Sequence, residues 1–249
     1  MLDKELIKKR FKQSLSTYNS EAIAQQKMNV KLCEYLSDNK FQNPLRLLEI
    51  GCGAGNLTQR IIEITDIDKM YLNDIVDLNP EHLGLSDNKI NCQIISGDAE
   101  EINFPEKLDL VISGATFQWF ENLDKVLDKV SQALKPGGIL LFSTFGKQNL
   151  IEIRNITGKG LSYLSINEIH KKIRSNFDIV KQEEESIELW FSDAKEVMQH
   201  LKKTGVNAVS VETWTKEKYR NFIEKYEDYK TKNAYRLTYH PMYFMLKKK

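Results

Sequence analysis

The segment "LLEIGCGAGNLT", residues 47–58, places three closely spaced glycines directly after a run of apolar residues. Glycine has no Cβ, so it permits positive φ angles and lets a ligand approach the backbone closely. In an α/β sheet this position is the turn between a strand and the next helix, and ligands bind beyond the carboxyl ends of such strands. Gly51, Gly53 and Gly55 therefore predict a ligand-binding loop.

The glycine spacing limits the ligand. A Walker A loop requires GxxxxGK(S/T), and no lysine follows these glycines, which excludes phosphate binding of that kind. A dinucleotide fingerprint requires GxGxxG, whereas this loop reads GxGxG with Asn56 at the position of the last glycine. The pattern favours a ligand without a diphosphate, and simple turn formation is the alternative role for the glycines.

Around this loop, short apolar segments alternate with segments of helical spacing. The segments of strand length are 45–50, 69–75, 91–98, 108–114 and 137–145. Helical spacing of apolar residues occurs at about 5–38, 56–64 and 123–134. Strands that alternate with helices at this spacing predict an α/β fold with a parallel, doubly wound sheet covered on both faces.

The second half of the chain is less regular. Residues 149–177 have helical spacing interrupted by a glycine-containing turn, and residues 177–191 indicate two strand segments around a polar turn. A helix is expected from a cap at Ser192 to Gly205, followed by a helix over 215–230 and one final strand over 235–246. We find no repeat and no low-complexity linker, so the sequence predicts one domain over 1–249.

Composition and charge exclude several function classes. The formal net charge is +1, so the whole molecule has no electrostatic reason to bind nucleic acid. The longest apolar runs are far shorter than the roughly 20 residues that a membrane helix needs, so no membrane association is expected. The first residues are charged throughout and lack the apolar core of a signal peptide, from which we expect a cytoplasmic protein.

The cysteines and histidines give no metal-ligand pattern. Three cysteines lie far apart without a CxxC pair, and the four histidines are equally scattered. We therefore expect no metal site and no disulfide framework.

Acidic residues follow the predicted strands. Asp74 ends the second strand, where a carboxylate can accept hydrogen bonds from both hydroxyls of a ribose. Asp98 follows the third strand, beside the expected position of a base, and Glu49 precedes the glycines. This set suits a nucleoside, and its negative charge suits a sulfonium better than a diphosphate. The alternative role of Asp74 is to cap a helix. The alternative role of Asp98 is that of a residue in a surface turn.

Five segments in order, "LEIGCGAGNLT", "LNDI", "GDAEEI", "LDLVISGATFQWF" and "ALKPGGILLFSTF", resemble class I S-adenosylmethionine-dependent methyltransferases. The resemblance implies a Rossmann-like, seven-stranded, mostly parallel sheet with N-terminal helices at 1–40. It also implies a donor-binding core at 41–146, a helical acceptor-side insertion at 147–178, and C-terminal strands and helices at 179–249 that complete the sheet. The donor is expected to contact Glu49, Gly51, Cys52, Gly53, Gly55, Asn73, Asp74, Asp98, Ala99 and Ser113.

The flanking segments resemble one family within this class. "FKQSLSTYNSEAIAQQ", "IELWFSDAKEVMQHLKKTGVNAV" and "YRLTYHPMYFML" are similar to the malonyl-[acyl-carrier protein] O-methyltransferases of biotin synthesis. This resemblance implies methylation of the free carboxylate of a malonyl thioester, held on acyl-carrier protein or on coenzyme A, toward a pimeloyl group. Gly114 departs from the broader class, in which Asn is common at this position. The (N/D)PP(Y/F) tetrapeptide of base-modifying methyltransferases is absent.

Such a reaction needs no general base, because a carboxylate with a pKa of about 4 is already ionised near pH 7. Catalysis would consist of in-line positioning and exclusion of water. Candidates that act on the acceptor are Tyr18, Gln118, Trp119 and Arg154, with Arg154 as a contact to the malonyl carboxylate. Gln25 and Phe120 are further candidates. Core packing or solvent exposure is the alternative role for each of these side chains.

Two basic clusters are candidates for binding an acidic carrier protein. They comprise Lys8, Lys9, Arg10 and Lys12 near the start, and Lys171, Lys172 and Arg174 in the insertion. A solvated helix face is the alternative for each. Other functions left open are methylation of a quinone precursor or a polycarboxylate, and donor binding without catalysis. A nicotinamide-dependent dehydrogenase is disfavoured by the glycine spacing.

Overall fold

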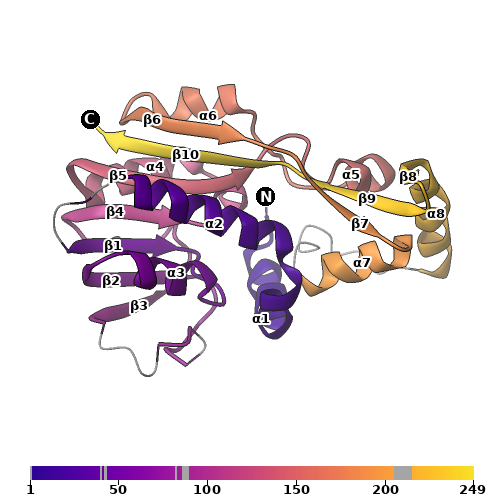
Figure 1. The fold of residues 1–249 in the computed structure, drawn as a ribbon, viewed down its shortest axis with the longest axis horizontal. Helices are drawn as coiled ribbons and strands as arrows, with labels where there is room; N and C mark the ends of the chain where they lie inside the picture. Colours follow the sequence, from indigo (N-terminus) through magenta and orange to yellow (C-terminus); the bar gives the residue numbers. More distant parts are fainter. Residues whose placement is uncertain (1, 40, 42–43, 82, 86–89, 205–214) are drawn as a thin grey trace.

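The computed structural model describes residues 2–39, 41, 44–81, 83–85, 90–204 and 215–249, and for residues 16–20 only the backbone. Its centre is a seven-stranded sheet of order β3-β2-β1-β4-β5-β10-β6, in which β10 runs antiparallel to both neighbours (Figure 1). The predicted doubly wound, mostly parallel sheet is confirmed. Its strands are β1 (Leu45–Ile50), β2 (Ile67–Asp74), β3 (Cys92–Ser96), β4 (Leu108–Ser113), β5 (Leu134–Phe145), β6 (Phe177–Glu184) and β10 (Pro241–Lys248).

Helices cover both faces of this sheet, as the alternating pattern predicts. The helices are α1 (Lys4–Glu21), α2 (Ile23–Asp38), α3 (Asn56–Ile64), α4 (Leu123–Ala133), α5 (Ile151–Thr157), α6 (Ile166–Ile173), α7 (Ala194–Lys203) and α8 (Lys216–Tyr226), with 3-10 turns η1 (Phe117–Trp119) and η3 (Glu227–Tyr229). The N-terminal helical region is thus two helices, separated at the buried Ala22.

Local sequence explains these elements. β4 is a buried strand of a parallel sheet and accordingly reads as an apolar run, with Leu110 to Ile112 fully buried. In α4 the apolar residues recur at helical spacing and face the sheet, while the Asn122 side chain caps the helix by accepting from the Lys125 N–H. The core accordingly forms two clusters, one under α2 and α3 and the other under α4 and α6.

The C-terminal part differs from the prediction. A second sheet of order β7-β9-β8 forms from β7 (Ile187–Phe191), β8 (Lys230–Thr231) and β9 (Ala234–Tyr239). The single final strand expected over 235–246 is therefore wrong, because the chain breaks at His240 into β9 and β10. Among the described residues of this part of the chain, β6 and β10 alone join the large sheet. The β6–β10 pair continues as the β7–β9 pair, so one antiparallel ribbon links the two sheets (Figure 1).

The cap of α7 is also one residue from its expected position. The Asp193 side chain, rather than that of Ser192, accepts the hydrogen bond from the Glu196 N–H. A carboxylate is a strong N-cap group and complements the positive end of the helix dipole. The expected end at Gly205 lies outside the described residues.

The insertion after β5 is anchored by a buried charge. The Glu152 carboxylate on α5 accepts hydrogen bonds from the backbone N–H and hydroxyl of Thr238 and from Arg236 Nε, all on β9. α5 is thereby held against the small sheet, and not against the carboxyl ends of β1 and β2. This placement determines where Arg154 lies.

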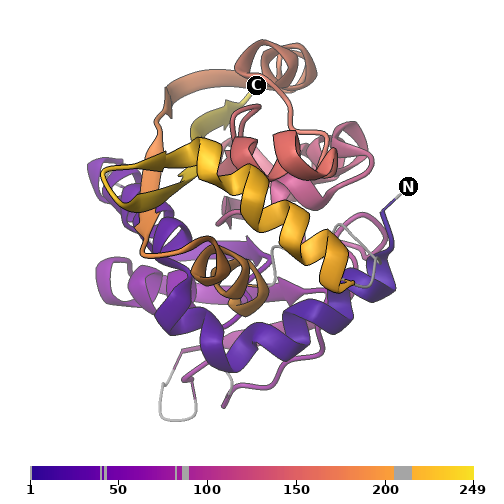
Figure 2. The same cartoon turned by 90° about the vertical axis from the view of Figure 1, so that its right-hand side faces the viewer.

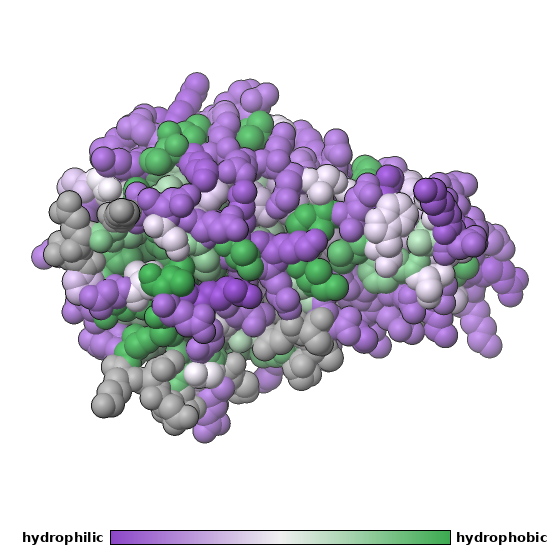
Figure 3. Space-filling view, viewed as in Figure 1, coloured by the Kyte–Doolittle hydropathy of each residue, from purple (hydrophilic) through white to green (hydrophobic). Residues whose placement is uncertain are grey.

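The visible face of the molecule is mainly hydrophilic, with separate hydrophobic areas (Figure 3). Among the described residues, no helix combines the length and the apolar character needed to cross a membrane.

Candidate active site

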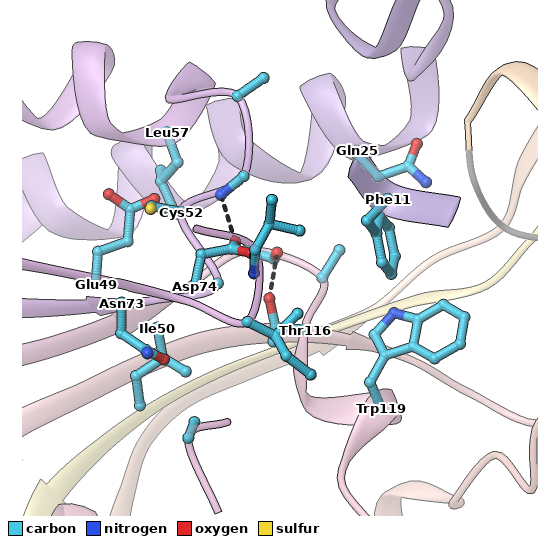
Figure 4. Close-up of a pocket in the computed structure, with 18 of the residues that line it drawn as sticks. Phe11, Gln25, Glu49, Ile50, Cys52, Leu57, Asn73, Asp74, Thr116 and Trp119 are labelled. Carbon is cyan, nitrogen blue, oxygen red and sulfur yellow. Dashed lines mark hydrogen bonds between the residues drawn. The ribbon is translucent and has the colours of Figure 1, made fainter. Parts of the chain in front are cut away.

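A pocket lies at the carboxyl ends of β1, β2 and β4, beneath α1 and α2. These parallel strands end at the same edge, and the sheet order reverses between β1 and β4, which is where ligands bind in such sheets. The pocket encloses about 1020 Å³, including space open to solvent. Figure 4 shows side chains from the strand ends and from both N-terminal helices converging on it.

Two features of the loop require glycine: a positive φ angle, and neighbouring atoms that leave no room for a Cβ. Gly51 has a φ of +75°, and a Cβ there would lie 2.1 Å from Oγ1 of Thr116. Gly55 has a φ of +80° immediately before α3, and a Cβ there would lie 3.0 Å from the carbonyl oxygen of Leu83. The loop backbone is therefore exposed to the pocket on one side and closely packed on the other.

Asp74 holds this loop from the neighbouring strand. Its carboxylate accepts a hydrogen bond from the N–H of Gly53 at 2.8 Å (Figure 4) and one from the N–H of Val76, also at 2.8 Å. Burial raises the pKa of Asp74, and these two backbone donors oppose that shift. Each carboxylate oxygen retains a lone pair, so Asp74 can also accept from a ligand hydroxyl.

Glu49 lies at the base of the pocket and is fully buried. It accepts a hydrogen bond from the Thr58 hydroxyl at 2.7 Å. Burial raises the pKa of the Glu49 carboxyl to about 8, and the nearby charge of Asp74 adds to this shift. Glu49 is therefore a neutral acid near pH 7 in the ligand-free protein.

The start of α1 crosses the other side of the pocket. The Lys4 ammonium lies 3.3 Å from the Asp98 carboxylate and 2.6 Å from that of Glu100, and it donates to the Trp119 carbonyl oxygen. Phe11 packs edge-to-face on Trp119, with ring centroids 5.3 Å apart. Thus α1 forms a wall that is partly ionic and partly apolar.

Most of the expected donor contacts line this pocket. Cys52 and Ala99 are buried in its wall, and Asn73 lines it while its amide donates to the carbonyl oxygens of Ile95 and Gly97. The Ser113 hydroxyl lies behind the wall, where it donates to the carbonyl oxygen of Ile50. The residues that the structure brings together at the pocket are Glu49, Gly51, Cys52, Gly53, Asn73, Asp74, Asp98, Ala99 and Trp119.

Full-length relatives identify the family. A malonyl-[acyl-carrier protein] O-methyltransferase of Calditerrivibrio nitroreducens is 38% identical over 97% of this chain and 96% of its own length. One of Acinetobacter baylyi is 35% identical over 99% of this chain and 98% of its own length. The chain belongs to the malonyl-[acyl-carrier protein] O-methyltransferase family. A family model described as a methyltransferase domain also matches residues 48–142.

Solved structures agree with the fold. The YcgJ protein of Bacillus subtilis superposes with a TM-score of 0.63 over 88% of this chain and 98% of that one, at 12% identity. The N-methyltransferase NodS of Bradyrhizobium japonicum, solved with S-adenosylhomocysteine, gives a TM-score of 0.54 at 11% identity, over 97% of this chain and 98% of that one. At these identities the likeness concerns the fold alone. Sequence similarity thus supports the assignment to the family, and structural similarity supports the fold.

For three residues expected on the acceptor side, the structure describes no side chain that lines the pocket. The Gln118 amide donates to the Ala115 carbonyl oxygen and accepts from the Thr144 hydroxyl. The Arg154 guanidinium stacks over the ring of Tyr163, 5.5 Å from its centroid, and donates to the backbone of residue 147. Tyr18 lies on α1, but its side chain is outside the described residues.

Sequence reasoning missed several pocket residues on the N-terminal helices. Lys4, Ile7, Phe11, Ser14 and Leu15 recur at helical spacing and form the inner face of α1. That spacing was a usable signal, although it indicates a buried face without saying what the face covers. Asn29 on α2 and Thr116 after β4 carry no comparable signal.

Within the described part of the chain, no group of three or more His, Cys, Asp or Glu side chains is placed to hold a metal ion.

The raised pKa of Glu49 predicts a specific pH dependence of stability. The folded protein retains a proton between about pH 4.5 and 8 that the unfolded chain releases, so stability falls as pH rises through this window. The slope is at most about 1.4 kcal/mol per pH unit. We expect Glu49→Gln to flatten this fall, measured by urea unfolding of the ligand-free protein at pH 5, 6, 7 and 8. Equal slopes in both proteins would contradict a neutral Glu49.

Proposed function

We propose that this protein transfers the methyl group of S-adenosylmethionine to the free carboxylate of a malonyl thioester on acyl-carrier protein. The observation that carries the proposal is the full-length similarity to malonyl-[acyl-carrier protein] O-methyltransferases, at 38% identity for the Calditerrivibrio protein. The pocket supports it independently, since its donor side offers the carboxylates that a nucleoside sulfonium requires, and Lys4, the cation among the described lining residues, is bound to Asp98 and Glu100.

The donor fits the residues at the strand ends. In the proposal, the remaining lone pairs of Asp74 accept from the ribose hydroxyls, and Asp98 faces the amino group of the base. The glycine loop lets the ligand lie against the backbone between them. The donor supplies an activated methyl group, and Asp74, Asp98 and the loop hold it in place.

The acceptor chemistry needs little from the protein. A carboxylate oxygen forms a bond to the methyl carbon as the carbon–sulfur bond breaks, which leaves a methyl ester and S-adenosylhomocysteine. The negative and positive charges neutralise each other during this step, so a site of low polarity that excludes water favours it. Ile7, Phe11 and Trp119 supply such an apolar wall beside the donor side of the pocket.

The outer face of α1 is the better candidate for binding the carrier protein. The inner face of this helix lines the pocket, and Lys9 and Lys12 are exposed on its other face. Figure 2 shows α1 leading from the N-terminus along the outside of the molecule. In the α6 cluster, Lys172 pairs with Asp124 at 2.5 Å, and no residue of α6 lines the pocket. A basic surface beside the entrance would attract an acidic carrier protein.

Loss of the Asp74 carboxylate should weaken donor binding. We expect Asp74→Ala to cost about 1–3 kcal/mol of affinity for S-adenosylmethionine, because charge-assisted hydrogen bonds to the ligand and the support of Gly53 are lost. Calorimetric titration measures this. Asp68→Ala is the matched control, an exposed aspartate on the same strand. Unchanged affinity in Asp74→Ala would show that the ribose binds elsewhere.

Methyl transfer itself tests the acceptor. Labelled S-adenosylmethionine is offered with malonyl-carrier protein, malonyl-coenzyme A, acetyl-carrier protein and free malonate. We expect base-labile ester label on the malonyl thioesters and none on the acetyl form, because only malonyl presents a free carboxylate. No label on either malonyl thioester, with binding of S-adenosylmethionine retained, would contradict the proposed acceptor and direct the search to quinone precursors, polycarboxylates or a non-catalytic role.

Charge reversal should separate the two basic clusters. We expect Lys9→Glu with Lys12→Glu to raise KM for malonyl-carrier protein roughly threefold to tenfold at low salt, and less at high salt, because steering by exposed charges is screened. Affinity for S-adenosylhomocysteine should stay unchanged in this variant. The matched control is Lys171→Glu with Lys172→Glu. A raised KM in the control variant alone would move the docking surface to α6.

A further inference from the structure

Two amide side chains on α2 line the pocket, and neither is fully hydrogen-bonded by the described residues. Gln25 and Asn29 are four residues apart, so they lie on the same face of the helix. Both side chains line the pocket, with only 5% of Gln25 and 8% of Asn29 exposed. Gln25 Oε1 is buried and has no hydrogen-bond partner in the part of the chain that the structure describes, and Figure 4 shows its side chain beside Phe11 at the pocket. No hydrogen bond joins the Asn29 amide to any described residue.

A buried carbonyl oxygen without a donor is rare, because its lost hydration is not compensated. This free-energy cost is removed if a ligand supplies a hydrogen-bond donor to the oxygen. In Figure 4 the neighbour of Gln25 is Phe11, whose ring offers no hydrogen-bond donor to the amide oxygen. The missing partner of Gln25 is therefore expected from the ligand that fills the pocket.

The position of Asn29 places this amide pair at one end of the donor site. Its Oδ1 lies 2.6 Å from the point that a Cβ on Gly114 would occupy, directly over the carboxyl end of β4. Asp74 and Asp98 lie at the ends of β2 and β3, on the other side of the glycine loop. Since neighbouring strands are about 4.8 Å apart, the end of β4 lies roughly 10 Å from that of β2. A nucleoside held by Asp74 would thus extend its other end toward Gln25 and Asn29.

We propose that Gln25 and Asn29 bind the amino-acid end of the methyl donor, an inference that rests on S-adenosylmethionine being the donor. The side-chain oxygens accept from the α-ammonium, and the amide N–H groups donate to the α-carboxylate. In this assignment the α-ammonium supplies the hydrogen-bond donor that Gln25 Oε1 lacks among the described residues. A malonyl carboxylate offers only acceptors and would leave that oxygen unsatisfied.

The charges around the pocket fit a pair of neutral amides. Lys4 is the one cationic side chain among the described lining residues, and its ammonium is already bound to Asp98 and Glu100. The amino-acid end of the donor carries one positive and one negative charge, so neutral groups that both donate and accept suit it. A side chain of either charge would favour one half and repel the other.

Two ligands that differ only in this end of the molecule test the proposal. S-adenosylhomocysteine carries the amino-acid end, and 5′-methylthioadenosine lacks it while keeping the nucleoside and the sulfur. We expect Gln25→Met and Asn29→Leu each to weaken calorimetric binding of S-adenosylhomocysteine about tenfold, because hydrogen bonds to charged groups are lost. Binding of 5′-methylthioadenosine should remain within about twofold of the original protein, which also shows that the pocket is folded.

The matched control is Gln26→Met, the same change at the next position of α2, outside the pocket lining. It should leave both affinities unchanged. Equal weakening of both ligands by Gln25→Met and Asn29→Leu would overturn the proposal, since the amides would then only shape the pocket. Unchanged binding of both ligands with a raised KM for malonyl-carrier protein would also overturn it and assign the amides to the acceptor. Failure of the original protein to bind either ligand would instead refute the proposed donor.

Discussion

The hydrogen bond from the Gly53 N–H to the Asp74 carboxylate is the contact on which the rest of the pocket depends. It joins the loop after β1 to the end of β2, so the glycine backbone is held at the pocket. The arrangement is possible because β1 and β2 are parallel and end at the same edge. Thr116 closes the loop from the opposite side, in the space that a side chain on Gly51 would occupy.

A second constraint is the closure of the pocket by the N-terminal helices. The apolar face of α1 needs a partner, and it finds one in Trp119 and the apolar parts of the pocket wall. Lys4 adds an ionic contact to Asp98, so the residue expected at the base of the donor also holds the helix. Contact of Asp98 with the donor, as proposed above, would therefore be coupled to the position of α1.

The flanks of the fold follow from pairing that is not local. The ribbon of β6–β7 with β9–β10 carries the chain out of the large sheet, and α5 is fastened to it through the buried Glu152. As a result Arg154 stacks on Tyr163 and does not line the pocket. Apolar alternation over 235–246 predicted a strand correctly but could not show that it changes sheets at His240, because both halves have strand character.

The sequence by itself determined the central α/β sheet, the glycine loop and the placement of Asp74 and Asp98 at strand ends. Each of these depends on local pattern, since apolar runs, glycines and strand-terminal acids are adjacent in the chain. Only the tertiary structure decided which side chains complete the pocket from α1 and α2, and which of the expected acceptor residues lie elsewhere. Gln25 was expected from the sequence to act on the acceptor, whereas Asn29 looks like an ordinary helix residue there. The burial of both side chains in the pocket, with Asn29 beside Gly114, depends on packing between segments far apart in the chain.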